Sequence, residues 1–362
     1  MKIIVLQDQL RSGGTERHSI LLSREFRAQG HDSQLVTFRP GGKLAPTAGP
    51  FTSLQPFDTG IDWFGPGLSR TVLSNSPNIV LCMGKTANCF AGHLQDKARS
   101  KGVGTKVVAT LRAGGVLPAL YYKSVRRAAH LVTNSREAAD ELVNLHGMER
   151  PKVTVIHNSL VYPEGSQARN EELRTKLGAG PTTTVLLSVG MFRPEKNQRA
   201  LLEIAAGFPP DWDWMLWLAG EGPERAACES LAAKLGISAR VRFLGYTQDP
   251  APLYRAADIA VHASKEEALS NFLIEAQSHG LPAVALRALG IQEYFIEGRT
   301  GWMLQQGDNA GFRAALARLA ADTPEERKAR ADEARSFTRS SFDPERQVTA
   351  YIDLFKLLSQ VG

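Results

Sequence analysis

Runs of consecutive apolar residues alternate with stretches of helical periodicity along most of the chain. The clearest runs are residues 2–6, Thr184–Val189 and Trp214–Ala219, and none shows the strict alternation of a strand exposed on one face. Near-continuous apolar runs are typical of parallel strands covered on both faces. Their alternation with helices predicts an α/β fold built from doubly wound parallel sheets.

Weaker patterns extend this alternation over both halves of the chain. Further strands are predicted at residues 51–57, 78–82, 106–110, 132–135, 153–156, 241–245, 259–263, 283–286 and 298–304. A first amphipathic helix ends at Gly30, and three helical stretches beginning at Asn309, Glu325 and Pro344 close the chain. Residues 161–181 are polar and are predicted to contain an interdomain linker and a short helix.

Composition agrees with a folded, two-domain protein. The 362 residues are 43% hydrophobic, and a chain of this length usually forms two domains. No apolar stretch approaches the roughly 18 uncharged residues of a membrane span, and the start of the chain leads directly into a strand, so we expect no signal peptide. The three cysteines, Cys82, Cys89 and Cys228, lack disulfide or zinc spacing, which favours a reducing cytoplasm.

Positive charge is concentrated in the first half of the chain. Residues 1–160 carry 20 Lys and Arg against 11 Asp and Glu, and the remainder carries 23 against 26, which together give the net charge of +6. An excess of this kind favours an anionic partner. Membrane phospholipid or a phosphorylated glycan fits better than nucleic acid, because no nucleic-acid-binding motif accompanies the charge.

The segment 264–286, SKEEALSNFLIEAQSHGLPAVAL, carries the most specific pattern. It follows one predicted strand, opens a helix at Ser270 or Asn271 and ends in another strand. This order places the loop at the carboxyl ends of the strands, where ligands bind, and the helix N-terminus there suits a diphosphate. Glu267 and Glu275 flank the site with seven residues between them. The spacing of Asn271, Glu275 and His279 also fits the polar face of an ordinary amphipathic helix.

The two glutamates, followed by G-L-P-A-V-A, resemble the E-x7-E signature of family 4 of the retaining glycosyltransferases with the GT-B fold. The resemblance implies that Glu267 faces the donor sugar and that Glu275 binds the ribose. It also implies that backbone amides from Ala268 and Leu269 to Ser270 and Asn271 contact the sugar and phosphates. Relatives commonly have glycine at position 268.

The block G-M-F-R-P-E-K-N at residues 190–197 is a second signal. Arg193 and Lys196 lie three residues apart on a glycine-led loop before a helix, so both can reach one diphosphate and neutralise it as it leaves. Two exposed surface cations would give the same spacing. The block resembles the glycine, arginine, lysine and asparagine pattern of the same family, in which Gly190 belongs to the donor site.

Several other positions in the second half match the family. Gly220 belongs to the loop G-E-G-P, and Leu244 lies on a strand that in relatives lines the base pocket through backbone groups, with Tyr246 beside it. Asp211 and Asp213 form a D-x-D pair, but the pair precedes its strand and therefore points away from the ligand edge. We interpret the two aspartates as turn-forming residues and expect no metal ion to bind them.

The first half begins with a loop that contains Gly13 and Gly14 and leads into a helix carrying His18. The run SGGTERHSILLSREFRAQGHDSQLVTF resembles the opening of family 4, although two glycines also make an ordinary strand-to-helix turn. The loop lacks the G-x-G-x-x-G fingerprint of dinucleotide-binding proteins, and Gly-Lys-Thr at 84–86 lacks the upstream glycine of a phosphate-binding loop.

Arg112 follows the strand at 106–110 by two residues. Many relatives of family 4 have a histidine near the end of this strand, close to the transferred sugar. A cation there could stabilise the diphosphate or hold an anionic acceptor, and a surface salt bridge is the alternative. Arg112 and His18 are therefore the candidates for the acceptor side. Residues 117–127 mix leucine, tyrosine and cations and predict either an interfacial amphipathic helix or a core helix with a basic edge.

The resemblance implies a GT-B fold with two Rossmann-like domains facing each other across a cleft. The expected boundaries are 1–162 for an N-terminal acceptor-binding domain and 163–343 for a nucleotide-sugar-binding domain, with residues 344–362 packing back on the first. The implied enzyme uses a UDP- or GDP-linked sugar without a cofactor and modifies a glycan or lipid-linked acceptor, such as lipopolysaccharide, at the inner face of the membrane. One alternative is a catalytically inactive nucleotide-sugar-binding or scaffold protein with the same fold. The other is an NAD-dependent oxidoreductase, which would need the glycine fingerprint that the sequence lacks.

Overall fold

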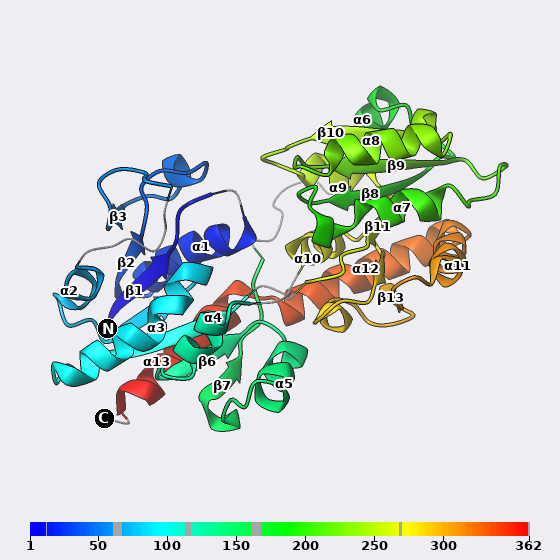
Figure 1. The fold of residues 1–362 in the computed structure, drawn as a ribbon. Helices are drawn as coiled ribbons and strands as arrows, with labels where there is room; N and C mark the ends of the chain where they lie inside the picture. The colour runs from blue at the N-terminus through cyan, green and yellow to red at the C-terminus, as the bar shows by residue number, and fades with distance from the viewer. Residues whose placement is uncertain (12, 61–66, 113–116, 161–167, 268–269, 361–362) are drawn as a thin grey trace. The chain divides into compact units, whose positions relative to one another are not determined.

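A computed structural model describes residues 1–11, 13–60, 67–112, 117–160, 168–267 and 270–360. The chain forms two compact units, one comprising Met1–Asn158 with Pro344–Gly362 and the other Ser159–Asp343 (Figure 1). The last helix thus belongs to the unit formed by the first half of the chain. Each unit is an α/β body with its own parallel sheet.

The first unit contains a seven-stranded parallel sheet in the order β3-β2-β1-β4-β5-β6-β7. Its strands are β1 (Lys2–Gln7), β2 (Asp32–Thr37), β3 (Phe51–Ser53), β4 (Ile79–Cys82), β5 (Lys106–Leu111), β6 (His130–Thr133) and β7 (Val153–Val155). Every residue of β4 is buried, as the apolar run predicts for a central strand covered on both faces. The strand order reverses between β1 and β4, and ligands bind at the carboxyl edge beside such a switch point.

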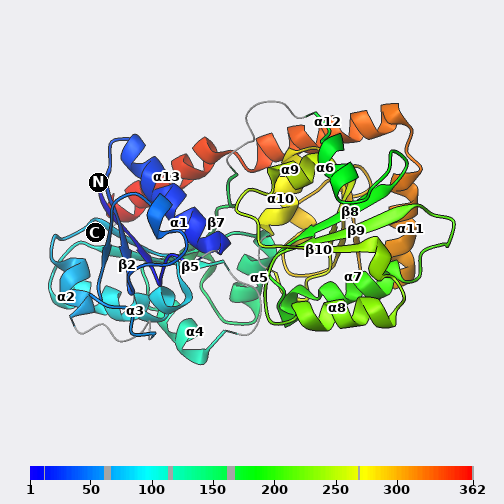
Figure 2. The ribbon, with the colours of Figure 1, turned by 90° about the horizontal axis from the view of Figure 1, so that it is seen from above.

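Helices cover both faces of this sheet. They are α1 (Gly14–Ala28), α2 (Leu68–Leu73), α3 (Lys85–Ser100), α4 (Ala119–Val125), α5 (Arg136–Asn144) and α13 (Pro344–Gln360). Figure 2 shows α1 and α13 on one face and α3 with α4 on the other. Phe26 of α1 packs edge-to-face against Tyr351 and Phe355 of α13, so the last helix completes the core of the first unit.

The second unit contains a six-stranded parallel sheet in the order β10-β9-β8-β11-β12-β13. Its strands are β8 (Thr184–Val189), β9 (Trp214–Ala219), β10 (Val241–Gly245), β11 (Ile259–His262), β12 (Ala283–Leu286) and β13 (Gly301–Leu304). The strand order reverses between β8 and β11, which places the expected ligand crevice at the carboxyl ends of these two strands. The strand predicted at 298–304 begins only at Gly301, because Gly298 and Thr300 form a turn back to Ile296 and Gly301.

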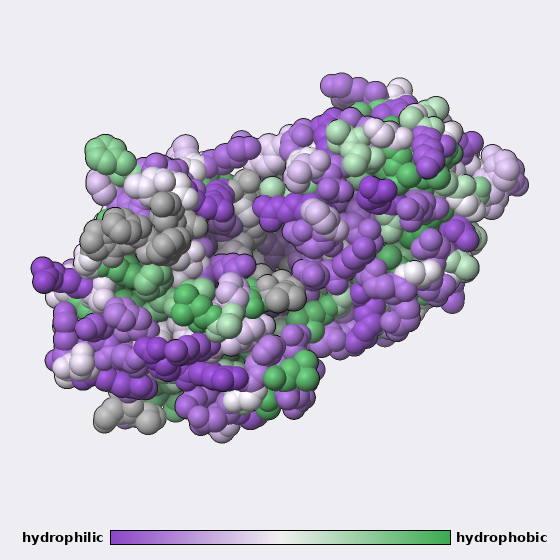
Figure 3. Space-filling view, viewed as in Figure 1, coloured by the Kyte–Doolittle hydropathy of each residue, from purple (hydrophilic) through white to green (hydrophobic). Residues whose placement is uncertain are grey.

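The second unit is likewise a three-layer structure (Figure 2). Its helices are α6 (Glu171–Lys176), α7 (Gln198–Ala205), α8 (Arg225–Lys234), α9 (Ala251–Ala256), α10 (Asn271–Ser278), α11 (Asn309–Ala320) and α12 (Pro324–Ser341). Side chains of α7, α8 and α11 form the core on one face, and those of α9 and α10 form it on the other. Hydrophilic side chains dominate the visible surface of α12 (Figure 3), and Thr323 begins this helix with a capping box.

In the described residues, short 3-10 helices also connect these elements: η1 (Ala45–Thr47), η2 (Arg150–Lys152), η3 (Pro194–Lys196), η4 (Ser238–Arg240) and η5 (Ile291–Glu293). Two of them, η3 and η5, belong to the site described below. In the described parts of the chain, no helix combines the length and the apolar character that a membrane crossing requires.

His130 makes the stability of the first unit dependent on pH. It is 7% exposed, and its Nε2 lies 2.8 Å from Thr154 Oγ1. Burial lowers the pKa of His130 to about 4, whereas the unfolded value is about 6.5. Below pH 6.5 the unfolded chain therefore binds a proton that the folded chain takes up only near pH 4, so acidification through this window destabilises the fold.

We expect His130→Gln, which keeps a hydrogen-bonding group but cannot titrate, to lose less stability on acidification. Between pH 6.5 and 5.5 the wild type should lose about 1 kcal/mol more than the variant. Urea unfolding at both pH values measures the difference. Equal losses in the two proteins would show that His130 is free to protonate in the folded state.

Candidate functional site

The loops after β8, β9 and β10 stack closely at the carboxyl edge of the second unit. The Gly190 N–H donates to the Ala219 carbonyl over 2.9 Å, and the Gly220 N–H donates to the Gly245 carbonyl over 2.8 Å. Gly220 has a φ of +144°, and a Cβ atom there would collide with the Gly190 carbonyl. Glycine is therefore required at position 220, and the two predicted glycines are neighbours in space.

The turn after β8 places Lys196 beside the loop that follows β11. Lys196 ends η3, and Asn197 reverses the chain with a φ of +52° before α7 begins. The Lys265 N–H donates to the Glu195 carbonyl over 2.8 Å and ties the two loops together. These backbone contacts bring two segments that lie about 70 residues apart in sequence to the same place.

Lys196 and Glu267 form an ion pair at this position. The Nζ atom of Lys196 contacts Oε2 of Glu267, and the Lys196 side chain is 27% exposed whereas that of Glu267 is 11% exposed. The same carboxylate oxygen lies 3.4 Å from Ser264 Oγ and 3.5 Å from His262 Nε2. Cation, hydroxyl and imidazole therefore converge on Oε2, and the pair is partly shielded from water.

These neighbours keep Glu267 ionised. Burial alone would raise the pKa of the Glu267 carboxyl, but the charge of Lys196, the nearby His262 imidazole and the Lys196 hydrogen bond outweigh burial and hold the pKa below its ordinary value. Burial lowers the pKa of His262 and outweighs the opposing effect of Glu267, so the imidazole is neutral at neutral pH. The site thus presents a carboxylate whose charge is matched by one lysine.

The start of α10 is held by two tyrosines. The Ser270 N–H donates to Tyr294 Oη over 2.7 Å, and Tyr254 Oη donates to Oε2 of Glu275 over 2.6 Å. Asn271 is the first residue of α10, and Glu275 lies one turn further on. Ala268 and Leu269, which were predicted to contribute amides to the site, lie outside the described residues.

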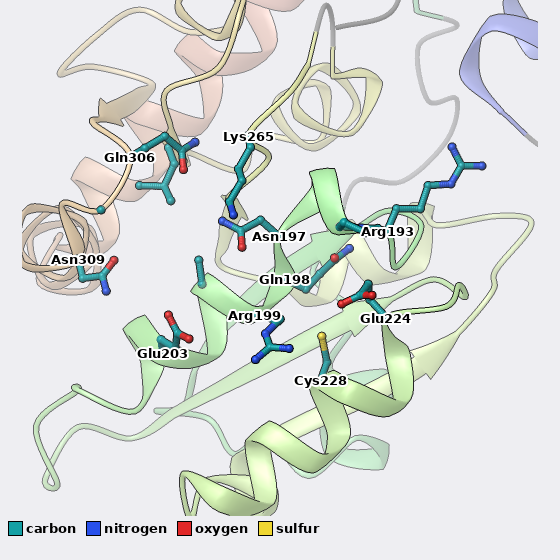
Figure 4. A pocket seen from close by; sticks show the side chains of 14 residues that line it. Arg193, Asn197, Gln198, Arg199, Glu203, Glu224, Cys228, Lys265, Gln306 and Asn309 are labelled. Atoms are coloured by element: carbon teal, nitrogen blue, oxygen red, sulfur yellow. The ribbon is translucent and has the colours of Figure 1, made fainter. Parts of the chain in front are cut away.

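Arg193 stands apart from the Lys196–Glu267 pair. Its side chain is 51% exposed and lies 3.8 Å from Glu195. It lines a cavity of about 510 Å³ bounded by α7, the start of α8 and the start of α11, and Figure 4 shows it extending away from Asn197, Gln198 and Arg199. Neither Lys196 nor Glu267 lines this cavity, so the cavity is not centred on the predicted chemistry.

Leu244 lies at an irregularity in β10, where the register with β9 shifts between Phe243 and Gly245. Its side chain packs partly against the core. Tyr246, which follows directly, is 46% exposed. The strand therefore ends beside the stacked glycine loops with an aromatic ring at the surface.

In the first unit, Gly13 and Gly14 begin α1, and a Cβ atom at Gly13 would collide with the Glu16 carboxylate. The helix thus starts with an acidic side chain folded back over its first turn, which suits the partial positive charge of a helix N-terminus. His18 lies one turn further along α1 and is 5% exposed. Its Nε2 atom has no hydrogen-bond partner within the described parts of the chain.

Arg112 lies near His18 at the carboxyl end of β5. One of its nitrogens, Nη1, donates to Tyr351 Oη over 3.1 Å, and Nη2 contacts Asn158 Oδ1. Burial lowers the pKa of the Arg112 guanidinium despite the opposing effect of Tyr351, and burial together with the Arg112 charge lowers the pKa of His18. Tyr351 and Asn158 are both neutral, so these two partners do not balance the charge of Arg112.

A cavity of about 190 Å³ adjoins Arg112 at the switch point of the first sheet. Among its lining residues are Asp8, Lys85, Asn88 and Thr110. The Asp8 carboxylate accepts the N–H groups of Thr86 and Ala87 over 3.0 and 2.9 Å. An internal carboxylate therefore occupies the N-terminus of α3, in the place a phosphate would take at a Gly-Lys-Thr loop.

Two further observations concern metals. Across the described ranges, no group of three or more His, Cys, Asp and Glu side chains could hold a metal ion. Asp213, part of the D-x-D pair, accepts hydrogen bonds from the hydroxyls of Thr182 and Thr183 over 3.0 and 2.9 Å. These residues precede β9 and β8, so the pair lies at the amino edge of the sheet.

Sequence reasoning missed the residues that hold Glu267 and Glu275. His262, Tyr254 and Tyr294 come from the end of β11, from α9 and from the turn after η5. Only His262 left a signal, because it interrupts the apolar run of β11 at its carboxyl end. The two tyrosines look like ordinary core residues in the sequence.

Two family profiles match successive parts of the chain. Residues 12–160 match the family described as Glycosyltransferase Family 4, and residues 169–337 match the family described as Glycosyl transferases group 1. The two matches follow each other in sequence and together span residues 12–337 apart from 161–168.

Curated relatives match over part of their length. The lipopolysaccharide core biosynthesis glycosyltransferase LpsE of Rhizobium meliloti is 37% identical over 149 residues, which are 41% of this chain and 43% of LpsE. The D-inositol 3-phosphate glycosyltransferase of Corynebacterium diphtheriae is 32% identical over 217 residues, 55% of this chain and 50% of the relative. The chain therefore spans about half the length of the curated relatives it matches.

Solved structures match over nearly the whole chain. HepE of Anabaena, in complex with UDP and glucose, superposes with a TM-score of 0.83 at 21% identity and covers 98% of this chain and 99% of its own. WaaG, a glycosyltransferase involved in lipopolysaccharide biosynthesis, superposes with a TM-score of 0.71 at 18% identity, covering 96% of this chain and 98% of its own. At these identities the likeness establishes the fold.

Proposed function

Because the chain belongs to glycosyltransferase family 4, the glycosyl transferases group 1 family with the GT-B fold, we propose that it transfers a sugar from a nucleoside diphosphate sugar to a glycan or lipid-linked acceptor with retention of anomeric configuration. The observation that carries the proposal is the shielded Lys196–Glu267 pair beside the start of α10. It joins the two most specific sequence motifs at the switch point of the second sheet.

The chemistry follows from the charges at this edge. Lys196, with Arg193 from the same turn, neutralises the diphosphate as the bond between the sugar C1 and the diphosphate oxygen breaks. Glu267 accepts hydrogen bonds from hydroxyls of the donor sugar through Oε1. Its contacts with Lys196, Ser264 and His262 are made by the other oxygen, Oε2. Glu275, held by Tyr254, accepts hydrogen bonds from the ribose, and the stacked loops at Gly190, Gly220 and Leu244 border the nucleotide.

We attribute the retention of anomeric configuration to attack by the acceptor on the same face of the sugar from which the diphosphate leaves. The acceptor hydroxyl oxygen bonds to C1 on the side from which the diphosphate departs, and the hydroxyl proton passes to a diphosphate oxygen. This route needs no covalent nucleophile from the protein. It also needs no metal ion, because Lys196, Arg193 and the helix N-terminus supply the positive charge.

The proposed donor is a UDP- or GDP-linked sugar. The matched structures of HepE contain UDP, UDP with glucose, or UDP-glucose, which supports a nucleoside diphosphate sugar as the donor. The Gly13–Gly14 loop of the first unit is assigned to the donor as well.

The acceptor side is assigned to Arg112 and His18. Arg112 offers a charge that its neutral partners Tyr351 and Asn158 do not balance, which suits an anionic group on a lipopolysaccharide-type or other cell-surface glycan acceptor. Relatives in lipopolysaccharide biosynthesis support this class of acceptor.

The proposed location is the cytoplasmic face of the membrane, reached through the first unit. Leu120 and Leu145 are 59% and 75% exposed, and the Tyr122 ring stacks on His146 with centroids 3.9 Å apart. Lys123 adds a cation beside these apolar groups, a combination that suits an anionic lipid surface. Flotation with phosphatidylglycerol vesicles tests the assignment, and binding that persisted unchanged in high salt would contradict its electrostatic part.

A catalytically inactive nucleotide-sugar-binding scaffold is the second candidate, favoured by Arg112 in place of the histidine of many relatives. Binding and turnover separate the two. Thermal unfolding with UDP, GDP, ADP, CDP and dTDP, their sugars, and NAD as a control tests binding first. A nucleotide at about 100 times its Kd should add about 2.7 kcal/mol of stability, and we expect this for UDP or GDP. No shift with any nucleotide would contradict the proposed transfer and leave a scaffold protein with the same fold.

A further inference from the structure

Tyr294 occupies a fixed position beneath the start of α10. Its side chain is fully buried, and its ring stacks on Phe342 with centroids 6.1 Å apart and an angle of 20° between the planes. Its carbonyl accepts the side-chain amide of Gln277, a residue of α10. Three groups of Tyr294, namely ring, carbonyl and hydroxyl, thus connect the turn after η5 to its surroundings.

The hydroxyl satisfies a backbone group that the helix itself leaves open. The first N–H groups of a helix have no partner inside the helix and are usually capped by the preceding side chain. Ser270 precedes α10 but provides no side-chain cap. The N–H of Ser270 itself, which its own side chain would not cap, donates to Tyr294 Oη over 2.7 Å in a buried setting, where an unpaired N–H would be costly.

This contact lies between the two glutamates of the proposed donor site. Ser270 follows Glu267 by three residues and precedes Glu275 by five. Burial and the nearby Glu267 carboxylate raise the pKa of Tyr294 well above its ordinary value, so the phenol stays protonated. The neutral hydroxyl therefore accepts the Ser270 N–H without placing a second buried negative charge beside Glu267.

We propose that Tyr294 is a positioning residue for donor binding, whose hydroxyl holds the start of α10 and thereby the placement of Glu267 and Glu275 toward the nucleotide sugar. The inference rests on the proposed function. Tyr294 is fully buried and does not itself contact the donor. The Ser270 N–H, engaged by Tyr294, supports the loop from inside the protein and is not counted among the diphosphate ligands.

Tyr294→Phe tests the proposal, because it keeps the ring and removes only the hydroxyl. We expect the KM for the nucleotide sugar and the Kd for UDP or GDP to rise about tenfold, the size of effect that one unpaired buried N–H can produce, while kcat changes less than twofold. A purely structural role would lower the melting temperature without this division between KM and kcat.

Thr300→Val is the matched control. The Thr300 hydroxyl accepts the Ile296 N–H over 2.9 Å, and Thr300 is fully buried. It lies just before β13, at the amino edge of the same sheet. Both variants lose one buried acceptor for a backbone N–H, so both should unfold at a lower temperature, but only Tyr294→Phe should weaken donor binding.

Hydrogen exchange supplies a second readout that does not depend on turnover. In the wild type without ligand, amides in the first turn of α10 should be protected, and Tyr294→Phe should accelerate exchange there but not in α11. Unchanged KM, Kd and exchange in Tyr294→Phe would overturn this inference alone. A wild type that bound neither UDP nor GDP would overturn the proposed function and this inference with it.

Discussion

Replacing Lys196 with methionine should lower kcat/KM for the nucleotide sugar by about 10²- to 10³-fold, because a positioned charge that stabilises a developing anion contributes about 3–4 kcal/mol to a transition state. Lys196 is partly shielded from water and already carries a defined orientation toward Glu267, so little reorganisation precedes the reaction. Methionine keeps most of the side-chain length and removes only the charge and its donors.

The loss should appear in kcat as well as in KM, since the diphosphate gains negative charge as it departs. Steady-state rates with the donor identified by thermal shift measure the effect. Lys234→Met is the control, because Lys234 is an exposed lysine of the same unit at the end of α8. A Lys196→Met enzyme as fast as the Lys234→Met enzyme would remove Lys196 from the proposed chemistry.

Glu267→Gln should lower kcat/KM by about 10²-fold, because it replaces a carboxylate that accepts sugar hydroxyls with a neutral amide and leaves the Lys196 charge without its partner. The environment holds the Glu267 pKa below its ordinary value. The activity that depends on this carboxylate should therefore persist as the pH falls through the ordinary carboxyl range near 4.3 and fail only below it.

The double variant, Lys196→Met with Glu267→Gln, sharpens this prediction. The two side chains are in direct contact, so their effects should be coupled and the double variant should lose less than the product of the single losses. Rates of all four proteins under one set of conditions give the coupling. Losses that multiplied without coupling would indicate that the two residues act on the substrate independently.

Most elements of both sheets were predictable because their signals are local. The apolar run at Trp214–Ala219 became β9 with every residue buried, and Thr184–Val189 became β8 with the predicted bounds. The predicted strand at 51–57 shortened to Phe51–Ser53. The N–H groups of Leu54 and Gln55 still donate to the carbonyls of Thr37 and Phe38, and Pro56, which has no N–H to donate, follows.

The motifs at the site were also visible in the sequence, but their support was not. Glu267 and Lys196 were predicted from spacing, and the fold brings them into contact across 71 positions. The contacts of Tyr294 with Ser270 and of Tyr254 with Glu275 depend on how η5 and α9 pack against α10. No periodicity encodes such pairings, because each joins residues from different elements.

Arg112 illustrates the same limit in the first unit. Its residue type and its place at the end of β5 could be predicted from the sequence. Its contact with Asn158 and its contact with Tyr351 of the last helix could not, because they depend on how distant segments pack in the first unit. The Asp8 carboxylate at the start of α3 is a similar case. It joins two carboxyl-edge loops that lie 78 positions apart in the chain.

Release of nucleoside diphosphate from its sugar conjugate tests the central claim most directly. Wild-type protein, the Lys196→Met variant and the Lys234→Met control would be incubated with UDP- and GDP-linked sugars, with and without lipopolysaccharide-type acceptors, and the free diphosphate would be quantified. We expect the wild type and the control to release diphosphate, and to release it faster when an acceptor is present. Lys196→Met should release it about 10²-fold more slowly. Tight nucleotide binding with no release under any of these conditions would contradict it and leave a nucleotide-sugar-binding scaffold.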